Sequence, residues 1–543
     1  MRFDIFPVKG QFCPGDTAAF YIENSGEASL AEIRVTALDG SVVKKRYPLS
    51  QGRQRAGLNE TVFKIGGYGV EADFYQGEEL LASCRTAFEV REPGEIIRYG
   101  FLSDFAQKDA GCEDVECMAK MHINTVQFYD WSWHHDHLVP LEAEYTDMMG
   151  KKNSLPVVKE KIEACHSHGM KAMGYGAIYA ASKEYQRQHS DESLYDGSGS
   201  PLCFIDTFYL MNPSRECSWH DHIIEQYQAS VKEVGFDGIH MDTYGTPKTA
   251  LDAQGKMVYL EETFPDLIGD VKKKLQEVHP SPMLIFNNVG GWPYQTTMTA
   301  DQEAVYIEVW PPNYRYHHLV RLIEDASLSG KTVILAAYPA PFRTDTPQRA
   351  LESQLFLSYV IAMTGATQLF FGEENAVITQ GYYGDYTRLS EEQLSKIRAY
   401  QDFFVRYGEI FYDKTLKTVS MTHQGWDNPE YIMEPKGSAD GEPGTLWYYI
   451  RENKDKKVIS ILNLKQNDDL WNEGKQTPEK EEQVHIRIQT LKAPKAVWFA
   501  SPDREGGDLQ VAQYQWVKAE QGMMVSLKVP VYRCSTVVLE LQK

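Results

Sequence analysis

The stretch GFDGIHMDTYG, residues 235–245, is a short apolar run that ends abruptly in a carboxylate, Asp242. Gly235 stands where an amphipathic helix over about 219–234 is expected to stop. A buried strand that follows a helix and ends in an acid is typical of α/β proteins, whose working side chains gather at the carboxyl ends of parallel strands. The stretch therefore predicts one strand of such a sheet.

Apolar runs of this kind recur through the middle of the chain and alternate with helical patterns. They number eight: 96–104, 123–130, 171–179, 235–242, 282–288, 304–310, 332–338 and 367–373. Helix signals lie between them, such as Ser154 before a helix with Pro156 in its first turn and a stop at Gly169, and a capping box that begins at Ser390. This alternation predicts a (β/α)8 TIM barrel over 94–412. A doubly wound open sheet would need a phosphate-binding glycine loop after its first strand, and GFLSDFAQ is not one.

The two ends of the chain have a different pattern. Residues 1–93 and 413–543 hold short alternating apolar runs separated by turn residues, which predict an N-terminal β-domain and a C-terminal β-sandwich. TVFKI, residues 61–65, is one of the expected strands. The charged stretch 465–484 is expected to be an exposed loop.

Composition narrows the class of partner. The net charge of −21 disfavours nucleic acid and anionic membranes, and no run of 18 apolar residues is present to span a bilayer. The N-terminus has no signal-peptide pattern, so we expect a cytoplasmic protein, or a secreted one if a leader was removed. The eight cysteines match neither a zinc site nor a disulfide framework, and we expect reduced thiols, no metal and no cofactor.

Polar and aromatic side chains stand where the predicted strands end. They are Asp104, Tyr129, Asp130, Trp131, Asp242, Asn287, Asn288, Glu308, Trp310, Tyr338, Glu373 and Asn375. Asp104, Asn288, Glu373 and Asn375 among them are predicted to bind substrate. These ends carry no lysine for a Schiff base, no ordered Ser-His pair and no histidine cluster with metal spacing. Carboxylates, amides and flat rings together are typical of a sugar site, because rings pack on sugar faces while polar groups bind hydroxyls.

Strand parity selects two of these carboxylates. Asp242 shares a face with His240, and Glu308 shares a face with Tyr306, while aliphatic residues fill the opposite faces. Both acids should therefore point into the barrel mouth, as glycoside hydrolysis requires. Aromatic neighbours should raise the pKa of Glu308 and make it the acid/base, whereas Thr243 should keep Asp242 charged as the nucleophile. The alternative for each acid alone is a helix cap or an ion pair.

Aromatic and histidine side chains near the mouth are further candidates for substrate binding. Tyr129, Trp131, Tyr244, Trp310 and Tyr338 have the ring type that stacks on sugars, although ordinary loop packing is the alternative for each one. The run WHHDH, residues 133–137, places His134 in a loop. A sugar-binding or solvated loop is favoured there over a metal site, because no second cluster completes the ligand set.

At these motifs the sequence resembles glycoside hydrolase family 66, the endo-dextranases and cycloisomaltooligosaccharide glucanotransferases. The matching stretches are GFLSDF (100–105), VQFYDWSWHHD (126–136), GFDGIHMDTYG (235–245), YIEVWP (306–311) and GEENAVITQGYYGDY (372–386). The resemblance implies an immunoglobulin-like domain, a catalytic barrel and a β-sandwich in that order. It also implies a retaining mechanism on α-1,6-glucan or isomaltooligosaccharides, with Asp242 as nucleophile, Glu308 as acid/base and Asp130 as a substrate-binding carboxylate.

One departure bears on the reaction. Cyclising family members carry a carbohydrate-binding module within the catalytic region, and the loops here are too short to hold one. This favours hydrolysis over cyclisation without excluding transglycosylation. Two other readings stay open: a retaining barrel glycosidase for another α-linkage, and a glycan-binding protein without catalysis.

Overall fold

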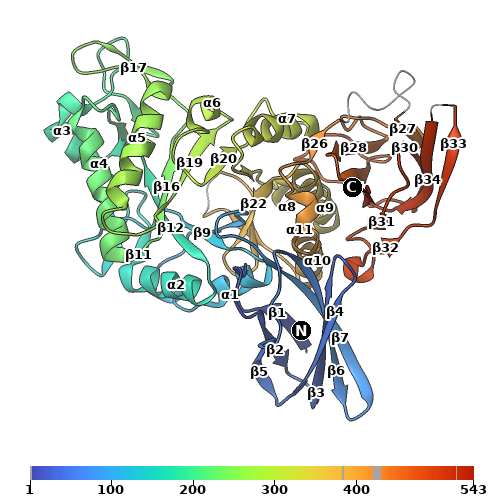
Figure 1. Cartoon of the computed structure of the whole chain (residues 1–543). Coiled ribbons are helices and arrows are strands. Elements are labelled where there is room, and N and C mark those ends of the chain that lie inside the picture. The colour runs from blue at the N-terminus through green and yellow to red at the C-terminus, as the bar shows by residue number, and fades with distance from the viewer. Residues whose placement is uncertain (1–2, 382–383, 420–429, 521, 543) are drawn as a thin grey trace.

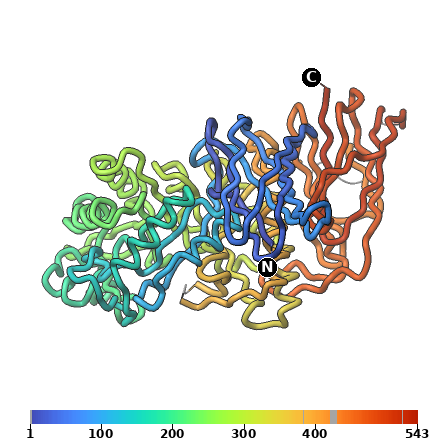
Figure 2. The backbone as a smooth tube through the Cα atoms, turned by 90° about the horizontal axis from the view of Figure 1, so that it is seen from below, coloured from blue at the N-terminus to red at the C-terminus, as the bar shows by residue number. Residues whose placement is uncertain are grey.

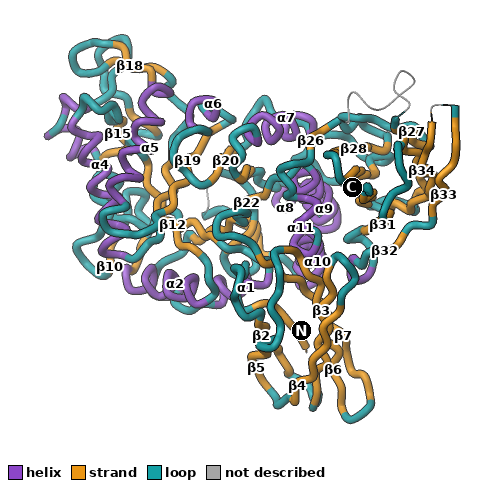
Figure 3. The backbone as a smooth tube through the Cα atoms, viewed as in Figure 1, coloured by secondary structure: helices purple, strands orange, loops and turns teal. Residues whose placement is uncertain are grey.

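The computed structural model describes residues 3–381, 384–419, 430–520 and 522–542. β-sheets at the two ends of the chain flank a central region in which strands alternate with helices, as Figures 1 and 3 show. Tyr382 and Tyr383 of the 372–386 motif lie outside the described residues. The eight cysteines all lie inside them and are free thiols.

The central sheet is curled and, in the described part of the chain, has 11 strands. From β22 to β8 in the order below, every pair of neighbours is parallel. The order is β22 (Thr367–Leu369), β21 (Thr332–Ala336), β20 (Ala304–Glu308), β19 (Met283–Val289), β16 (Gly238–Asp242), β12 (Lys171–Ala177), β9 (Thr125–Phe128), β8 (Tyr99–Leu102), β23 (Phe371–Gly372), β24 (Ala376–Ile378) and β25 (Tyr386–Arg388). Each of the eight predicted runs contains a strand, so these predictions are confirmed.

The two faces of this sheet have different surroundings, as parity predicts. Ile239 and Ile307 belong to the large core that the sheet shares with the helices. Tyr306 and Ile285 belong to a second, inner cluster with Tyr99 and Met173 of other strands. Residues that share a face with Tyr306, including Glu308, therefore lie on the inner side of the curled sheet.

Helices connect successive strands of the central sheet. They are α1 (Glu113–Lys120), α2 (Leu155–Ser167), α3 (Lys183–Gln188), α4 (Ser218–Ala229), α5 (Leu260–Leu275), α6 (Tyr294–Thr297), α7 (Tyr316–Ser327), α8 (Pro341–Thr344), α9 (Pro347–Met363), α10 (Glu391–Arg406) and α11 (Gly408–Phe411). The capping box of α10 is confirmed, because Ser390 Oγ accepts from the Gln393 N–H and Gln393 Oε1 accepts from the Ser390 N–H. Among the described residues no helix is both long and apolar enough to span a membrane.

Seven short strands lie in the connections between the described strands of the central sheet. They are β10 (Glu144–Thr146), β11 (Lys152–Ser154), β13 (Ala180–Ala181), β14 (Cys203–Phe204), β15 (Phe208–Leu210), β17 (Thr249–Leu251) and β18 (Met257–Tyr259). After α4 the chain makes a π-helical turn, Ser230–Val234. This helix ends at Gly235, which has a φ of 104°. Only glycine adopts that left-handed conformation easily, so the predicted helix stop is confirmed.

The N-terminal strands form two sheets around their own core. They are β1 (Phe3–Pro7), β2 (Ala19–Asn24), β3 (Leu30–Ala37), β4 (Val42–Pro48), β5 (Gly52–Gly57), β6 (Gly66–Gln76) and β7 (Glu79–Val90), in orders β1-β2-β5 and β4-β3-β6-β7. The predicted strand TVFKI is wrong: residues 61–65 are irregular, and Phe63 is buried among aromatic rings rather than paired in a sheet. From below, these blue strands lie in front of the junction between the central and C-terminal parts (Figure 2).

The C-terminal strands also form two sheets around a separate core. They are β26 (Lys417–Thr418), β27 (Tyr431–Glu434), β28 (Leu446–Glu452), β29 (Lys456–Asn463), β30 (Glu482–Gln489), β31 (Ala496–Ala500), β32 (Gln510–Val511), β33 (Tyr514–Ala519), β34 (Gly522–Val531) and β35 (Cys534–Glu540), in orders β26-β28-β29-β35-β31-β32 and β27-β30-β34-β33. The stretch 465–484 is only partly an exposed loop, because Asp469 and Trp471 are buried against the central region.

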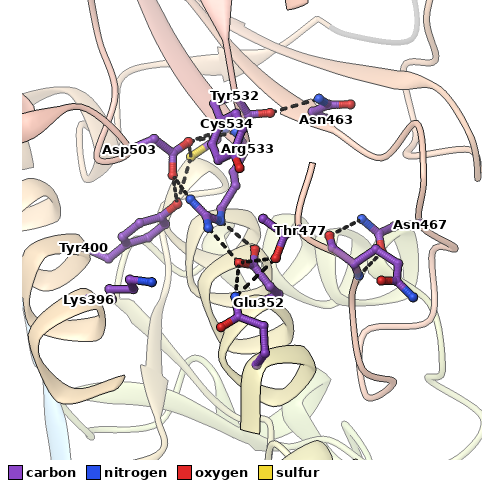
Figure 4. Close-up of polar contacts among 12 residues, drawn as sticks. Glu352, Lys396, Tyr400, Asn463, Asn467, Thr477, Asp503, Tyr532, Arg533 and Cys534 are labelled. Atoms are coloured by element: carbon purple, nitrogen blue, oxygen red, sulfur yellow. Dashed lines mark hydrogen bonds and ion pairs between the residues drawn. The ribbon is translucent and has the colours of Figure 1, made fainter. Parts of the chain in front are cut away.

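A buried ion-pair network joins the C-terminal strands to the central helices (Figure 4). Arg533 donates two hydrogen bonds of 2.6 Å to Glu352 of α9 and one of 2.9 Å to Asp503. Tyr400 of α10 donates to the same Asp503 at 2.7 Å. The carboxylates are almost fully enclosed, with side chains 0 % and 2 % exposed, so Arg533 is their main source of compensating charge.

Candidate active site

The two acids selected by parity lie on the inner side of the sheet and share a hydrogen-bond donor. Asp242 ends β16 and Glu308 ends β20, on opposite sides of β19. Asn287 of β19 donates its amide nitrogen to Asp242 Oδ1 at 2.6 Å and to Glu308 Oε2 at 3.2 Å. One nitrogen therefore keeps these two carboxyl oxygens within about 6 Å of each other, close enough to serve one glycosidic bond.

Each acid also has donors of its own. Tyr175 of β12 donates its hydroxyl to Asp242 Oδ2 at 2.6 Å. Tyr338, just after β21, donates to Glu308 Oε1 at 2.8 Å, and the Trp310 side chain is a further donor to Glu308. Asp242 is partly exposed and Glu308 is 9 % exposed.

Burial raises the pKa of both acids. The pKa of Asp242 rises to about 7, first because of burial and second because of the nearby negative charge of Glu308. The pKa of Glu308 also rises because of burial, against the opposing donors Trp310, Tyr338 and Asn287. The predicted rise at Glu308 is confirmed. Each carboxyl group therefore keeps its proton to a higher pH than an exposed acid would.

The prediction that Thr243 keeps Asp242 charged is wrong in part. The Thr243 backbone N–H does bond to Asp242. The hydroxyl, however, donates to the Asn287 backbone carbonyl at 3.2 Å. Tyr175 and Asn287, rather than this threonine, supply the side-chain donors to Asp242, and they do not return its pKa to the ordinary value.

A neutral histidine lies beneath the acids. His240 precedes Asp242 by two residues on β16, and its Nδ1 is 3.0 Å from the Tyr99 hydroxyl. Its ring lies edge-on to Tyr306 at 4.9 Å. Burial lowers the pKa of His240 to about 3, so the ring is neutral at physiological pH. His240 therefore adds no positive charge to the site at physiological pH.

Asp130 and Tyr129 lie on the other side of Asp242. Asp130 has a left-handed φ of 48°, which turns the chain as it leaves β9. Burial, together with the charges of Asp147 and Asp242, raises the pKa of Asp130 to about 7. The Tyr129 ring contacts the Tyr175 ring edge-on at 4.8 Å. These two residues therefore continue the surface formed by Tyr175 and Asp242.

The model of glycosyl hydrolase family 66 matches residues 7–534. The chain belongs to glycosyl hydrolase family 66. It is therefore an enzyme that acts on glycosidic bonds. The match covers all three regions described above, from the N-terminal sheets to the last strand of the C-terminal sheets.

Relatives and solved structures agree with this family. Two cycloisomaltooligosaccharide glucanotransferases of Niallia circulans are 22 % identical over 690 residues (97 % of this chain and 70 % of that protein) and 21 % identical over 587 residues (80 % and 60 %). A crystal structure of a cycloisomaltooligosaccharide glucanotransferase from Paenibacillus sp., complexed with cycloisomaltoheptaose, has a TM-score of 0.87 at 18 % identity, over 99 % of this chain and 100 % of that one. A noncanonic maltogenic α-amylase, AmyB from Thermotoga neapolitana, has a TM-score of 0.52 at 11 % identity, over 83 % and 100 %. At these identities the structures show a shared fold.

Other predicted residues of this family 66 enzyme lie at the rim. Asp104 accepts from Tyr386 at 2.6 Å and pairs with Lys151 at 2.9 Å; although burial opposes it, these partners lower the pKa of Asp104. The Tyr244 ring stacks on Phe204 at 4.2 Å, and within the described residues its buried hydroxyl has no hydrogen-bond partner. Both residues therefore remain candidates for contact with a ligand.

Two more rim side chains expose flat rings. The Trp310 side chain is 42 % exposed beside Gly381. His134 stacks on Trp133 at 4.1 Å with its side chain 31 % exposed. Among the described residues, no group of three or more histidine, cysteine or acidic side chains is arranged to hold a metal ion.

Trp131 and Asn288 do not line the site, and their prediction as substrate-binding residues is wrong. The Trp131 side chain is 0 % exposed, with its indole N–H donating to the Tyr175 carbonyl at 3.1 Å. Asn288 is also 0 % exposed; it donates to the Tyr306 carbonyl and accepts from Thr297. Both side chains point away from the inner face and are fully partnered.

Glu373 and Asn375 are likewise corrected. The Glu373 carboxylate is buried and accepts from the backbone N–H groups of Ser103 and Asp104, so it ties β8 to β23 rather than facing a ligand. Burial raises the pKa of Glu373 to about 8. Asn375, with a φ of 56°, lines a different cavity between α1 and α10.

Asn287, Tyr175, Tyr386 and Lys151 contact the key carboxylates, and sequence reasoning did not select them. Asn287 stood beside the residue that was chosen, in the pair Asn287-Asn288. Tyr175 lies inside an apolar run and carries no polar signal of its own. Tyr386 begins β25 and ends the motif 372–386, but nothing in the motif shows that it contacts Asp104, and Lys151 lies in a connection whose position depends on the folded chain.

Proposed function

We propose that this enzyme is a retaining glycoside hydrolase that cleaves α-1,6-glucosidic bonds of dextran or isomaltooligosaccharides. The observation that carries the proposal is the Asn287 amide, which holds Asp242 and Glu308 within about 6 Å on the inner face of the sheet. Retaining enzymes separate their carboxyl groups by about 5–5.5 Å, whereas inverting enzymes need about 6.5–9.5 Å to admit a water molecule. The short separation favours double displacement.

In the first step Asp242 attacks the anomeric carbon while Glu308 gives its proton to the departing glycosidic oxygen. The products are a β-glucosyl ester on Asp242 and a shortened glucan with a new hydroxyl. In the second step ionised Glu308 removes a proton from water, whose oxygen displaces the Asp242 carboxylate with a second inversion. The raised pKa of Glu308 suits it to both duties, because the group can hold a proton for the first step and release it for the second.

The linkage and the acceptor are proposed from the relatives. Both Niallia circulans proteins are named cycloisomaltooligosaccharide glucanotransferases, and the Paenibacillus enzyme was complexed with cycloisomaltoheptaose, which supports an α-1,6-glucan substrate. The first of these alignments spans 690 positions, more than the 543 residues of this chain. The relative therefore carries residues that this chain lacks, which favours water over cyclisation as the usual outcome. Transfer to a sugar hydroxyl is the second candidate, and the names of the relatives favour it.

We also propose that the curled sheet is a closed (β/α)8 barrel within a three-part chain, divided at 1–93, 94–412 and 413–543. Support for closure comes from residues 367–372. Their first half, β22, pairs with β21. Their second half, β23, begins two residues after β22 ends and pairs with β8 through Gly372 and Phe101. The same short segment therefore contacts both the last and the first strand of the curled sheet. The separate N-terminal and C-terminal cores support the division.

The roles of the two acids are tested by substitution and azide rescue. Asp242→Asn and Glu308→Gln should each lower reducing-end release from dextran by several orders of magnitude, while exposed Asp39→Asn and Glu60→Gln should not. With an aryl α-isomaltoside, azide should rescue Asp242→Ala as the β-glucosyl azide and Glu308→Ala as the α-glucosyl azide. Full activity of either carboxamide variant, or the opposite pair of azides, would overturn the assignment.

The reaction outcome needs a product time course. Dextran digests separated by size should show linear isomaltooligosaccharides that accumulate from the start. Cyclic products as the main species would favour transfer. Activity on pullulan or an aryl α-galactoside but not on dextran would favour another linkage, and glycan binding without bond cleavage would favour a non-catalytic role.

A further inference from the structure

The segment Asp469–Asn472 belongs to the C-terminal part of the chain but contacts the central region. It lies in the connection between β29 and β30, within the stretch expected to be exposed. Asp469 is 4 % exposed and Trp471 is 6 % exposed. A carboxylate and an indole are buried in this way only where partners satisfy them, and these partners lie in two loops beside Glu308.

The first loop follows β20 and carries Trp310. The Trp471 indole N–H donates to the Asn313 carbonyl at 2.5 Å, and the Trp471 backbone N–H donates to the Tyr314 carbonyl at 3.1 Å. Asn313 in turn donates both its backbone and its side-chain N–H to the Trp310 carbonyl, each at 3.1 Å. Asn313 therefore links Trp310 to Trp471 by hydrogen bonds on both sides.

An ion pair and a short β-bridge continue this contact. Asp469 pairs with Arg315, and its backbone carbonyl accepts from the Tyr316 N–H at 2.9 Å at the start of α7. Arg315 and Leu470 form an antiparallel bridge. Arg315 and Tyr316, at the end of this loop, are thus held by backbone and side-chain bonds together. This restricts the movement of residues 309–314, which connect them to Glu308.

The second loop follows β21 and begins with Tyr338. Asn472 accepts, through Oδ1, a 2.8 Å hydrogen bond from the Ala340 N–H. The same N–H donates to the Tyr338 carbonyl at 2.9 Å, so one backbone group links Asn472 to Tyr338. Trp310 and Tyr338 are both donors to Glu308. Both loops that supply these donors are therefore held by four consecutive residues.

We infer that residues 469–472 are positioning residues for the acid/base, which hold Trp310 and Tyr338 in hydrogen-bonding contact with Glu308. The inference rests on the proposed function and assigns a catalytic task to the C-terminal part of the chain. Groups that face Glu308 from other elements are the titratable Asp242 of β16 and the amide of Asn287 on β19, and residues 469–472 contact neither in the described structure. The segment therefore acts on the acid/base and not on the nucleophile.

The direction of the expected effect follows from the donors. Trp310 and Tyr338 stabilise ionised Glu308, which the second chemical step requires. If the loops loosen, these hydrogen bonds weaken and the pKa of Glu308 rises further. The basic limb of the pH–rate profile should then move to higher pH, and breakdown of the glucosyl-enzyme should slow at pH 7.

The test uses the full chain with Asn472→Ala and Trp471→Phe. Each substitution removes one hydrogen bond, so kcat on dextran should fall about five- to tenfold, KM should change less than about twofold, and the basic limb should move upward. Asn472→Asp keeps an acceptor oxygen for the Ala340 N–H and should restore kcat to within about twofold of wild type. A general loss of stability would not be rescued in this way.

Asn463→Ala is the matched control. Asn463 is another asparagine of the C-terminal part, more buried than Asn472, and it donates to the Tyr532 carbonyl at 2.9 Å rather than to either loop (Figure 4). It should lower thermal stability but leave the pH profile in place. Wild-type kcat and an unmoved basic limb in Asn472→Ala would overturn the inference, as would an equal movement in Asn463→Ala.

Failure of this inference can be separated from failure of the proposed function. If Glu308→Gln is inactive but Asn472→Ala is silent, only the positioning role is refuted. If Glu308→Gln keeps full activity, the proposed function itself fails. Hydrogen–deuterium exchange of peptides over 310–316 and 338–345 needs no substrate, and it should be faster in Asn472→Ala and Trp471→Phe than in wild type. Unchanged exchange would refute the contact on which the inference depends.

Discussion

Replacement of Asn287 by alanine should move the whole pH–rate profile of this enzyme to higher pH. The substitution removes one nitrogen that donates to Asp242 at 2.6 Å and to Glu308 at 3.2 Å. A hydrogen bond to a charged group contributes about 1.5–3 kcal/mol, which corresponds to about one to two pH units. Loss of the donor destabilises each ionised carboxylate, so the pKa of each acid rises.

The magnitude follows from the pKa of Asp242, which is about 7 in the intact site. About half of the molecules then carry a charged Asp242 at pH 7, and a rise of one to two units leaves about a tenth to a hundredth of them charged. Relative to the half that is charged in the intact site, the rate at pH 7 should fall about five- to fiftyfold and recover as the pH rises. The two pKa values belong to the pair of acids, so both limbs of the profile should move.

The assay is kcat/KM on dextran from pH 4.5 to 9.5, which reports the acids of the free enzyme. Asn288→Ala is the matched control, because it is the next amide on the same strand and donates to the Tyr306 carbonyl instead of a carboxylate. That variant should lose stability but keep both limbs in place. Equal profiles for Asn287→Ala and wild type, or the same movement in Asn288→Ala, would refute the reasoning.

Three further outcomes follow from the same structure. Tyr338→Phe removes the 2.8 Å donor to Glu308, so kcat should fall about tenfold and the basic limb of the same profile should move upward. Arg533→Met leaves the buried carboxylates of Glu352 and Asp503 without their partner, and urea unfolding should show a loss of about 3–5 kcal/mol. His240 has a folded-state pKa of about 3 against an ordinary 6.5, so the unfolded chain binds one more proton between these values and stability falls as pH falls. Between pH 6.5 and 5 this contributes a loss of about 2 kcal/mol, which urea unfolding of His240→Gln should not show.

The sequence predicts the central strands well because their surroundings are simple. A parallel strand covered on both faces is mostly apolar, and a charged residue is expected mainly where the strand ends, as at Asp242. Helix ends are equally local: the capping box at Ser390 satisfies N–H groups within one turn. TVFKI fails because an alternating pattern also suits an irregular segment with one buried ring, here Phe63.

Three of the four wrong site residues, Trp131, Glu373 and Asn375, lie where the chain leaves the extended conformation. Parity assigns a side chain to a face only while the backbone stays extended. Asp130 has a φ of 48°, and the indole of Trp131 then enters the core between sheet and helices. Glu373 and Asn375 follow the same rule, with φ values of 43° and 56°. No local signal in the sequence marks these turns, because none of the three positions is a glycine.

The choice between Asn287 and Asn288 could have been made from the sequence. Parity had already placed Tyr306 and Glu308 on the inner face, and in the sheet Asn287 pairs with Tyr306. Met283 and Ile285, two and four residues before Asn287, lie in the inner cluster. Counting back from the pair by twos puts Asn287 with those apolar residues and Asn288 with Phe286 on the helix side. A periodicity of two therefore identifies the residue that joins the two acids. Trp471 and Asn472 instead lie about 160 residues beyond Glu308 in the chain and act on it through Trp310 and Tyr338, so only the folded structure reveals them.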